Sequence, residues 1–164
     1  MTMATLLVAF FALCSLSAAT ATANFIDNPF LVKGKVYCDT CNCGFETTAT
    51  KYIPGSRVQI ECRNRDTNAL TYTIEGITNS EGEYSILVES ERGGDFCDVV
   101  LKQSSDPVCD VPSQGRDRAR VILTRNNGIS SDVRFANSMG FATARPLPSC
   151  PQLLQHYHLN DDNF

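Results

Sequence analysis

The stretch LVKGKVYCDTCNCGF, residues 31–45, alternates in the manner of a β-strand and then places three cysteines within six positions. From Val32 to Cys38 the even-numbered positions are apolar or small, whereas the odd-numbered positions are Lys33, Lys35 and Tyr37. A period of two places these two sets of side chains on opposite faces of a strand. The stretch therefore predicts a strand that is buried on one face and exposed to solvent on the other.

The same alternation recurs along the chain in short segments. It is clear at residues 58–62, 72–74, 84–88, 97–101 and 121–123, and weaker at residues 45–51. Turn-forming sequences separate these segments: Pro54-Gly55, Asn79 to Gly82, Gly93-Gly94 and Asn127-Gly128. We therefore expect an all-β fold, a small antiparallel sandwich or barrel of about seven strands, with a short C-terminal helix or tail from residue 151.

The first 23 residues have the composition of a secretory signal peptide. An uncharged apolar run from Leu6 to Leu16 precedes a series of small residues that ends at Ala23. The run is about half as long as the roughly 20 residues that cross a bilayer, and no second apolar run follows it. We expect cleavage after Ala23, secretion into the extracellular space, no membrane span, and a single domain over residues 24–164.

Seven cysteines remain after that cleavage. They are Cys38, Cys41, Cys43, Cys62, Cys97, Cys109 and Cys150. A structural zinc site usually uses two closely spaced pairs, and the last four of these cysteines lie far apart in the sequence. A redox Cys-x-x-Cys motif draws its reactivity from a helix N-terminus, whereas Cys38 and Cys41 follow a predicted strand. A disulfide framework of three bridges and one odd thiol is the favoured interpretation, and the spacing alone does not choose the pairing.

The sequence offers little for catalysis. Its two histidines, His156 and His158, both lie in the C-terminal tail, so a serine or cysteine nucleophile in the strand-forming body has no histidine base. Glu81 and Glu83 are favoured as solvated turn charges over a glycosidase pair, whose carboxyl groups face each other across a cleft. We expect no catalytic residue, no metal site and no cofactor. The net charge of −4 argues against a nucleic acid partner.

Charge is unevenly distributed along the chain. Residues 75–110 hold nine carboxylates and two cations, a local charge of −7, and residues 116–145 hold six arginines and two aspartates, a local charge of +4. Two solvated faces of a small domain are the simpler interpretation. Complementary patches for a protein or polysaccharide partner are the alternative.

Several motifs together resemble one plant family. They are GKVYCDTC at 34–41, PGSRVQIEC at 54–62, TNSEGEYSILVE at 78–89, FCDVVL at 96–101 and PLPSC at 146–150. This set resembles the olive-pollen major allergen family, also called the pollen allergen and extensin family. Within that family, residues 116–141 are similar to the pollen-specific C13-type proteins. The resemblance covers nearly all of the chain after the expected cleavage site.

The resemblance implies a secreted, disulfide-stapled plant protein of pollen. Members of the family are best known as allergens, have proposed roles in pollen hydration and tube growth, and have no established enzymatic activity. Related tomato pollen proteins are associated with receptor kinases at the cell surface. We therefore expect a non-enzymatic monomer that binds an extracellular protein receptor or a cell-wall polysaccharide. A cell-wall hydrolase or an inhibitor-like module is the alternative, and it would need a concave site with convergent polar groups.

The resemblance also implies a disulfide pairing. By position, the bridges would be Cys38 with Cys109, Cys41 with Cys150, and Cys62 with Cys97. The last pair also agrees with the strand pattern, because both cysteines continue the inward-facing set of their strand. Cys43 falls where the family usually has another residue, which makes it the candidate free thiol.

Overall fold

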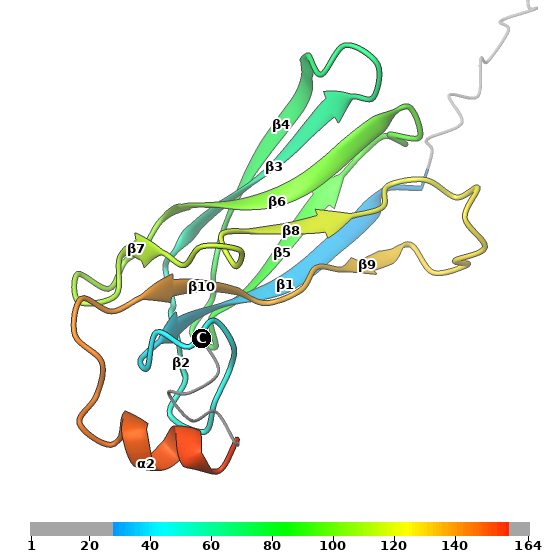
Figure 1. Cartoon of the computed structure of the whole chain (residues 1–164). Helices are drawn as coiled ribbons and strands as arrows, with labels where there is room; N and C mark the ends of the chain where they lie inside the picture. The colour runs from blue at the N-terminus through cyan, green and yellow to red at the C-terminus, as the bar shows by residue number, and fades with distance from the viewer. Residues whose placement is uncertain (1–27, 158–164) are drawn as a thin grey trace, which may run out of the picture.

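The computed structural model describes residues 28–157, which form two β-sheets packed face to face (Figure 1). The first sheet is built around the long strand β1 (Phe30–Asp39). Its other members are β2 (Lys51–Tyr52), β5 (Glu83–Val88), β7 (Val111–Pro112), β9 (Val133–Phe135) and β10 (Met139–Ala142). Within the described residues these two sheets do not join into one closed barrel, so the fold is the sandwich, and the barrel alternative is wrong.

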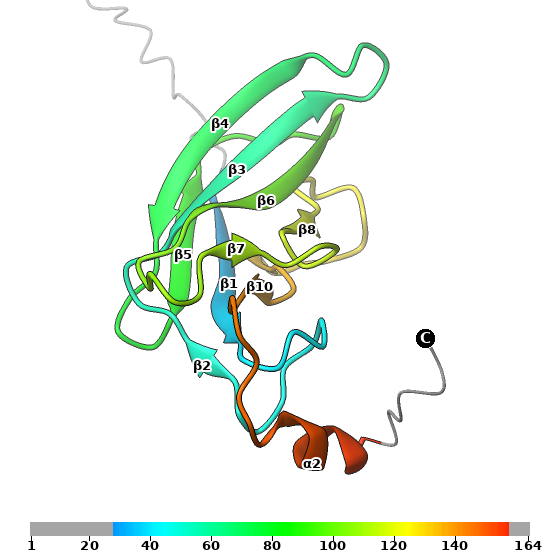
Figure 2. The ribbon, with the colours of Figure 1, turned by 60° about the vertical axis from the view of Figure 1, so that its left-hand side comes forward.

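The second sheet is wholly antiparallel and has the order β4-β3-β6-β8. Its strands are β3 (Arg57–Asn64), β4 (Leu70–Ile77), β6 (Asp95–Gln103) and β8 (Arg118–Val121). Figure 2, turned from the first view, shows the β3–β4 hairpin at the end of the molecule away from the C-terminal helix. The chain therefore forms an elongated sandwich with its longest hairpin at one end.

Alternating side chains from both sheets form the core. Val32 and Val36 of the first sheet and Val58, Ile60 and Val99 of the second are all fully buried. Each residue belongs to the set of strand positions that the sequence predicts to face inward. Removing these two apolar faces from water is the main term that holds the sheets together.

The central strand β1 pairs with two strands from late in the chain, and both pairings are parallel. Lys33 lies opposite Phe135 of β9, and Val36 lies opposite Met139 of β10. The three steps from Lys33 to Val36 thus correspond to four steps from Phe135 to Met139, so the regular pairing with β1 is interrupted at residues 136–138. This break opens the sheet beside Gly34 and Lys35, which is the position of the candidate site described below.

Two of the predicted strands differ in the structure. Residues 45–51 form bends and turns, and only Lys51–Tyr52 pairs as β2, so the weaker predicted strand is wrong. The physical reason is the preceding loop, in which Asn42 and Gly44 have positive φ and turn the chain away from the sheet. The predicted strand at 121–123 is displaced, because β8 ends at Val121 although Leu123 remains buried.

The sequence patterns missed β9 and β10. In β9 the usual pattern is inverted, since Arg134 is buried and Phe135 is 78% exposed. In β10 there is no alternation, because Met139, Gly140 and Phe141 are all buried. Gly140 lies under the Tyr37 ring, where an added Cβ would come within 2.7 Å of Tyr37 Cζ. These strands are recognisable only from their pairing with β1.

The C-terminal helix α2 (Cys150–Gln155) is short and begins directly after Ser149. Proline in its first turn costs no hydrogen bond, because the first amide groups of a helix have no partner within it. The predicted short helix is therefore confirmed. No helix within residues 28–157 has the length and hydropathy of a membrane span. The predicted signal peptide, residues 1–23, lies outside the described residues.

Candidate functional site

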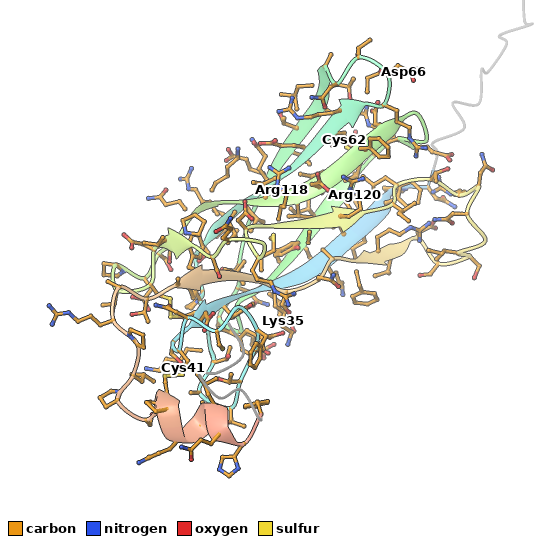
Figure 3. The ribbon with its side chains drawn as sticks, viewed as in Figure 1. Lys35, Cys41, Cys62, Asp66, Arg118 and Arg120 are labelled. Atoms are coloured by element: carbon orange, nitrogen blue, oxygen red, sulfur yellow. A yellow bond between two sulfur atoms is a disulfide. The ribbon has the colours of Figure 1, made fainter. Side chains whose placement is uncertain are left out.

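Three disulfides staple the sandwich. Cys38 is bonded to Cys109, Cys41 to Cys150 and Cys62 to Cys97, with Cα–Cα distances of 5.8, 5.5 and 4.0 Å. These are the pairs that the family resemblance implies. Cys62 and Cys97 lie directly opposite each other on β3 and β6, whereas Cys41, labelled in Figure 3, connects the end of β1 to the helix α2.

The loop after β1 is organised by a buried aspartate. Asp39 is 1% exposed, and its carboxylate accepts hydrogen bonds from the backbone amides of Cys41 at 3.2 Å and Gly44 at 2.6 Å. Asn42 exchanges two hydrogen bonds with the backbone of Thr143, which fixes this loop to the chain that follows β10. The cysteine-rich stretch is therefore a structural anchor, held by polar contacts as well as by sulfur.

Cys43 has a half-buried thiol and no disulfide. Its Sγ lies 3.5 Å from Asp39 Oδ1 and from the Phe45 carbonyl oxygen. Burial, with a smaller contribution from the Asp39 carboxylate, raises the pKa of the Cys43 thiol. A raised pKa keeps the sulfur as a thiol, which is a poor nucleophile and a poor metal ligand.

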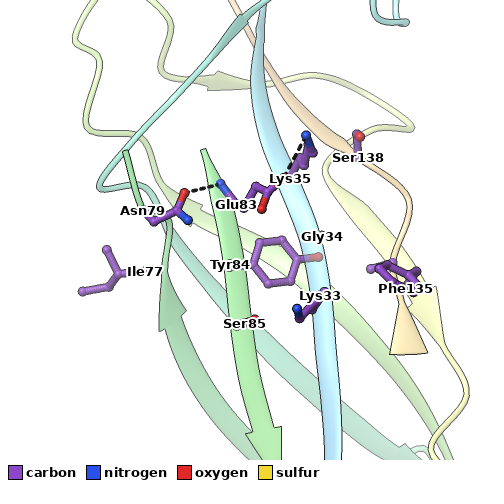
Figure 4. Close-up of a pocket in the computed structure, with 11 residues that line it drawn as sticks. Lys33, Gly34, Lys35, Ile77, Asn79, Glu83, Tyr84, Ser85, Phe135 and Ser138 are labelled. Carbon is purple, nitrogen blue, oxygen red and sulfur yellow. Dashed lines mark hydrogen bonds and ion pairs between the residues drawn. The ribbon is translucent and has the colours of Figure 1, made fainter. Parts of the chain in front are cut away.

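A concave site with both charged and apolar lining residues lies at the break in the first sheet (Figure 4). We call this depression of about 530 Å³ the outer groove. The residues that define it are Lys33, Lys35, Ile77, Glu83, Tyr84 and Phe135. They come from β1, from the end of β4, from β5 and from β9, so the groove exists only in the assembled sandwich.

The floor of the outer groove is a tyrosine packed on a glycine. Tyr84 lies opposite Gly34 in the β1–β5 ladder, and a Cβ added to Gly34 would come within 2.3 Å of Tyr84 Oη. Tyr84 is 2% exposed, and its hydroxyl has no hydrogen-bond partner. Burial raises the pKa of Tyr84 well above its usual range. Glycine is therefore required here for close packing rather than for an unusual φ.

Two lysines of β1 have different surroundings in the outer groove. Lys35 Nζ lies 2.9 Å from Glu83 Oε1 and 4.8 Å from the centre of the Tyr52 ring. The hydrogen bond that Lys35 donates to the Glu83 carboxylate raises the pKa of Lys35. Lys33 makes no ion pair with any residue of the described range and lies opposite Phe135 in the ladder. The groove thus offers one unpaired cation beside an exposed aromatic ring.

Glu81, Glu83 and His156 have separate surroundings in the structure. Glu83 forms an ion pair with Lys35. Glu81 is exposed in the turn before β5, where its backbone amide donates a hydrogen bond to Asn79 Oδ1. His156 is exposed at the C-terminal end of α2. His158 lies outside the described residues. No group of three or more potential metal-ligating side chains occurs among residues 28–157.

The two oppositely charged segments meet on the outer face of the second sheet. Asp98 of β6 lies 3.5 Å from Arg118 and 2.5 Å from Arg120, both of β8 (Figure 3). Arg125 pairs with Asp132 within its own segment. Part of the charge asymmetry seen in the sequence is therefore neutralised inside the molecule. Phe135 is not recognisable as a site residue from the sequence, because the burial pattern of β9 is inverted.

The fold and its three bridges define a small, disulfide-stapled β-sandwich of the kind found among plant pollen proteins. The chain belongs to the family described as pollen protein Ole e 1 like, whose model matches residues 28–158. It is 40% identical to the Olee1-like protein of Betula pendula over 155 residues, which cover 93% of this chain and 92% of that protein. It is 42% identical to the pollen-specific protein C13 of Zea mays over 134 residues, covering 82% and 79% of the two chains.

A solved structure is similar as well. The crystal structure of the major plantain pollen allergen Pla l 1 matches with a TM-score of 0.66 and 27% sequence identity. The match covers 74% of this chain and 99% of the plantain chain. The relatives are named as pollen proteins or pollen allergens rather than as enzymes, and this chain shares their fold.

Proposed function

We propose that the chain is a secreted, non-enzymatic pollen protein that acts in pollen hydration or tube growth by binding an extracellular protein through the outer groove. The observation that carries this proposal is the exposure of Phe135 and Ile77, at 78% and 62%, on either side of the unpaired Lys33. Exposed aromatic side chains such as Phe135 are enriched at protein interfaces. Because Lys33 and Phe135 lie on paired strands of one sheet, their backbones are already ordered before binding.

The chemistry of the groove favours binding over hydrolysis. Its single carboxylate, Glu83, is held by Lys35, and a glycosidase needs two carboxyl groups placed across the substrate. Purified protein should therefore release no reducing sugar from pectin or xylan. Turnover that disappears in Glu83→Gln would overturn the non-enzymatic proposal.

Secretion is part of the same proposal, and three disulfides are in keeping with an oxidising compartment. Mass spectrometry of protein recovered from the culture medium of plant cells that express the whole chain should give an N-terminus at Asn24. A mature N-terminus upstream of residue 23, or retention of the protein inside the cells, would contradict it.

The binding partner can be tested by photo-crosslinking. Phe135 is replaced by p-benzoylphenylalanine, the protein is added to germinating pollen, and adducts are examined after ultraviolet exposure. Val108, which is 66% exposed and outside the groove, receives the same replacement as a matched control. A specific adduct at position 135 that is destroyed by protease supports a protein partner. An adduct destroyed by pectinase, or adducts equal at both positions, would contradict it.

A further inference from the structure

A second concave site lies on the second sheet, away from the outer groove, and it is lined by three arginines. We call it the arginine cleft; it has a volume of about 190 Å³ and contains Arg65, Arg92, Phe96 and Arg120. Arg65 follows β3, Arg92 precedes β6 and Arg120 belongs to β8. Three segments that are distant in sequence therefore each contribute one arginine to the lining of this cleft.

Each of these guanidinium groups is stacked on an aromatic ring. Arg65 and Arg120 lie 4.9 and 4.8 Å from the centre of the Phe96 ring, which they approach from the strands on either side of β6. Arg92 lies 4.1 Å from the centre of the Tyr72 ring. Stacking holds a guanidinium plane in position while leaving the N–H groups at its edge available to donate.

The arginine cleft carries more positive charge than its own acids neutralise. Arg120 is paired with Asp98, but neither Arg65 nor Arg92 makes an ion pair within residues 28–157. Arg65 Nε donates only to the backbone carbonyl of Asp95, and the Asp95 carboxylate accepts from the Thr71 hydroxyl. Arg92 Nε is buried and has no hydrogen-bond partner. A buried donor without a partner is costly, and an incoming acceptor would remove that cost.

The sheet under the arginine cleft is rigid. The Cys62–Cys97 bridge joins β3 to β6 directly beside Phe96, which lies opposite Arg63 in the ladder. The anchoring ring is therefore fixed before any ligand arrives. A preorganised set of donors binds an acceptor with a smaller entropic cost than a set of free surface side chains.

From this geometry we infer that the arginine cleft receives a carboxylate side chain, from aspartate or glutamate, of a protein partner. The inference rests on the proposed function, in that the partner is an extracellular protein. The planar guanidinium fork matches a carboxylate in a bidentate manner. The cleft is smaller than the 300 Å³ or more that is typical of small-molecule sites, and it accommodates a single side chain.

A protein carboxylate fits the surroundings better than a uronic acid does. The guanidinium groups of Arg65 and Arg120 already lie 4.9 and 4.8 Å from the centre of the Phe96 ring, so a sugar that stacked on this ring would compete with them. Ile122, which is 49% exposed, supplies an apolar rim beside the arginines. Arginine next to exposed apolar groups is the composition of an interface hot spot.

The test uses ¹⁵N-labelled protein and observes the Nε–H signals of the cleft arginines. The probe is a blocked pentapeptide, Gly-Glu-Tyr-Glu-Gly, and its control is the same peptide with glutamine in place of both glutamates. The acidic peptide should shift the signals of Arg65 and Arg92 in a saturable manner, and the glutamine peptide should not. Unchanged arginine signals, or equal shifts with both peptides, would overturn the inference.

Variants and competing ligands sharpen the same experiment. Arg92→Lys keeps the charge but loses the fork, and Arg65→Gln removes an exposed cation; each should weaken binding of the acidic peptide by about tenfold, the value of one charge-assisted hydrogen bond. Arg145→Gln, at an exposed position outside the cleft, should leave the affinity unchanged. Tetragalacturonate or inorganic phosphate binding the cleft more tightly than the acidic peptide would also overturn the inference.

Failure of this inference is distinguishable from failure of the proposed function. If crosslinking at position 135 identifies a protein partner that the Arg65→Gln/Arg92→Lys protein binds at full strength, the arginine cleft has no such role and the proposed function stands. If no protein adduct forms at position 135 while the acidic peptide still titrates the cleft arginines, the carboxylate site stands and the outer groove loses its role.

Discussion

The guanidinium of Arg134 lies 4.7 Å from the centre of the Phe30 ring, and both residues are buried. Arg134 Nε donates to the carbonyl oxygen of Ile122 at 3.0 Å, and its Nη2 donates to that of Thr124 at 3.2 Å. These carbonyl groups belong to the segment that follows β8, the edge strand of the second sheet. One side chain of the first sheet thus satisfies backbone groups that a neighbouring strand would otherwise pair.

Arg134→Met should therefore lower the free energy of unfolding by about 3 kcal/mol, because it removes a buried guanidinium group and leaves the carbonyl groups of Ile122 and Thr124 without these donors. Urea denaturation monitored by circular dichroism measures the loss. Arg145→Met, at an exposed position, is the matched control and should stay within about 0.5 kcal/mol of the parent. Equal stability of the two variants would show that Arg134 is dispensable at this edge.

Gly34→Ala should destabilise the fold by about 2 kcal/mol, because the added Cβ would collide with the Tyr84 hydroxyl. Gly94→Ala is the control, since a Cβ there meets no atom within 4 Å and its φ is ordinary. Thermal melts of the two proteins give the comparison. A Gly34→Ala protein as stable as Gly94→Ala would mean that the tyrosine moves aside without cost.

Tyr84→Phe should raise the free energy of unfolding by about 1 kcal/mol at neutral pH, because it removes a buried hydroxyl that has no partner. The aromatic ring that fills the space between the sheets is retained. Urea midpoints at equal m-values measure the change. A loss of stability would indicate that the hydroxyl has a partner in solution, such as an ordered water.

Alkaline pH should destabilise the protein. Burial raises the pKa of Tyr37 to about 12 and also raises that of Tyr84, whereas the unfolded chain releases these protons near pH 10. Between about pH 10 and 12 the folded state therefore binds more protons than the unfolded state, so stability falls as pH rises. Urea midpoints measured from neutral pH upward check this: the two tyrosines should cause no change below about pH 10 and a fall above it. The fall should be shallower in Tyr84→Phe.

Cys43→Ser should leave the fold and the oligomeric state unchanged, because Cys43 has no disulfide. Cys41→Ser should release α2, since its bridge to Cys150 joins the helix to β1. Peptide mapping without reduction should give the three observed pairs and a free Cys43. A Cys43–Cys150 link would contradict the assignment, and a Cys43–Cys43 dimer would make this thiol an assembly element. Amide hydrogen exchange in α2 measures this release and should be faster in Cys41→Ser than in the parent protein.

Local sequence signals predict only part of this fold. β3 and the first half of β1 face the core on one side and water on the other, and they show the expected period of two. Tyr37 of β1, expected on the solvent face, is 1% exposed because its ring packs over Gly140 of β10, so that expectation is wrong. β9 carries a buried arginine and an exposed phenylalanine, which is the reverse of that pattern. Its position depends on parallel pairing with β1, and no local pattern records a partner so distant in sequence.

The candidate site is predictable to a similar degree. Lys33 and Lys35 belong to the solvent face that the alternation of β1 indicates. Phe135 joins Lys33 only through the parallel ladder, so the outer groove cannot be derived from the pattern of either strand. The strand pattern favours the pair Cys62–Cys97, but the full disulfide pairing follows only from the family resemblance, because cysteine spacing alone does not choose among the possible pairings.

The parallel pairing of β1 with β9 and β10 means that the first sheet can be completed only after the C-terminal part of the chain has been synthesised. Leu31 pairs opposite Val133 and Asp39 opposite Ala142, so each contact closes a loop of about 100 residues. During synthesis the first strand leaves the ribosome long before its partners are made, and β5 is the earliest long strand that can pair with it. Domains dominated by such non-local contacts fold slowly. A nascent chain that stops before residue 133 leaves one edge of β1 unpaired and able to pair with other chains. Synthesis of the C-terminal strands therefore ends the period in which β1 can aggregate.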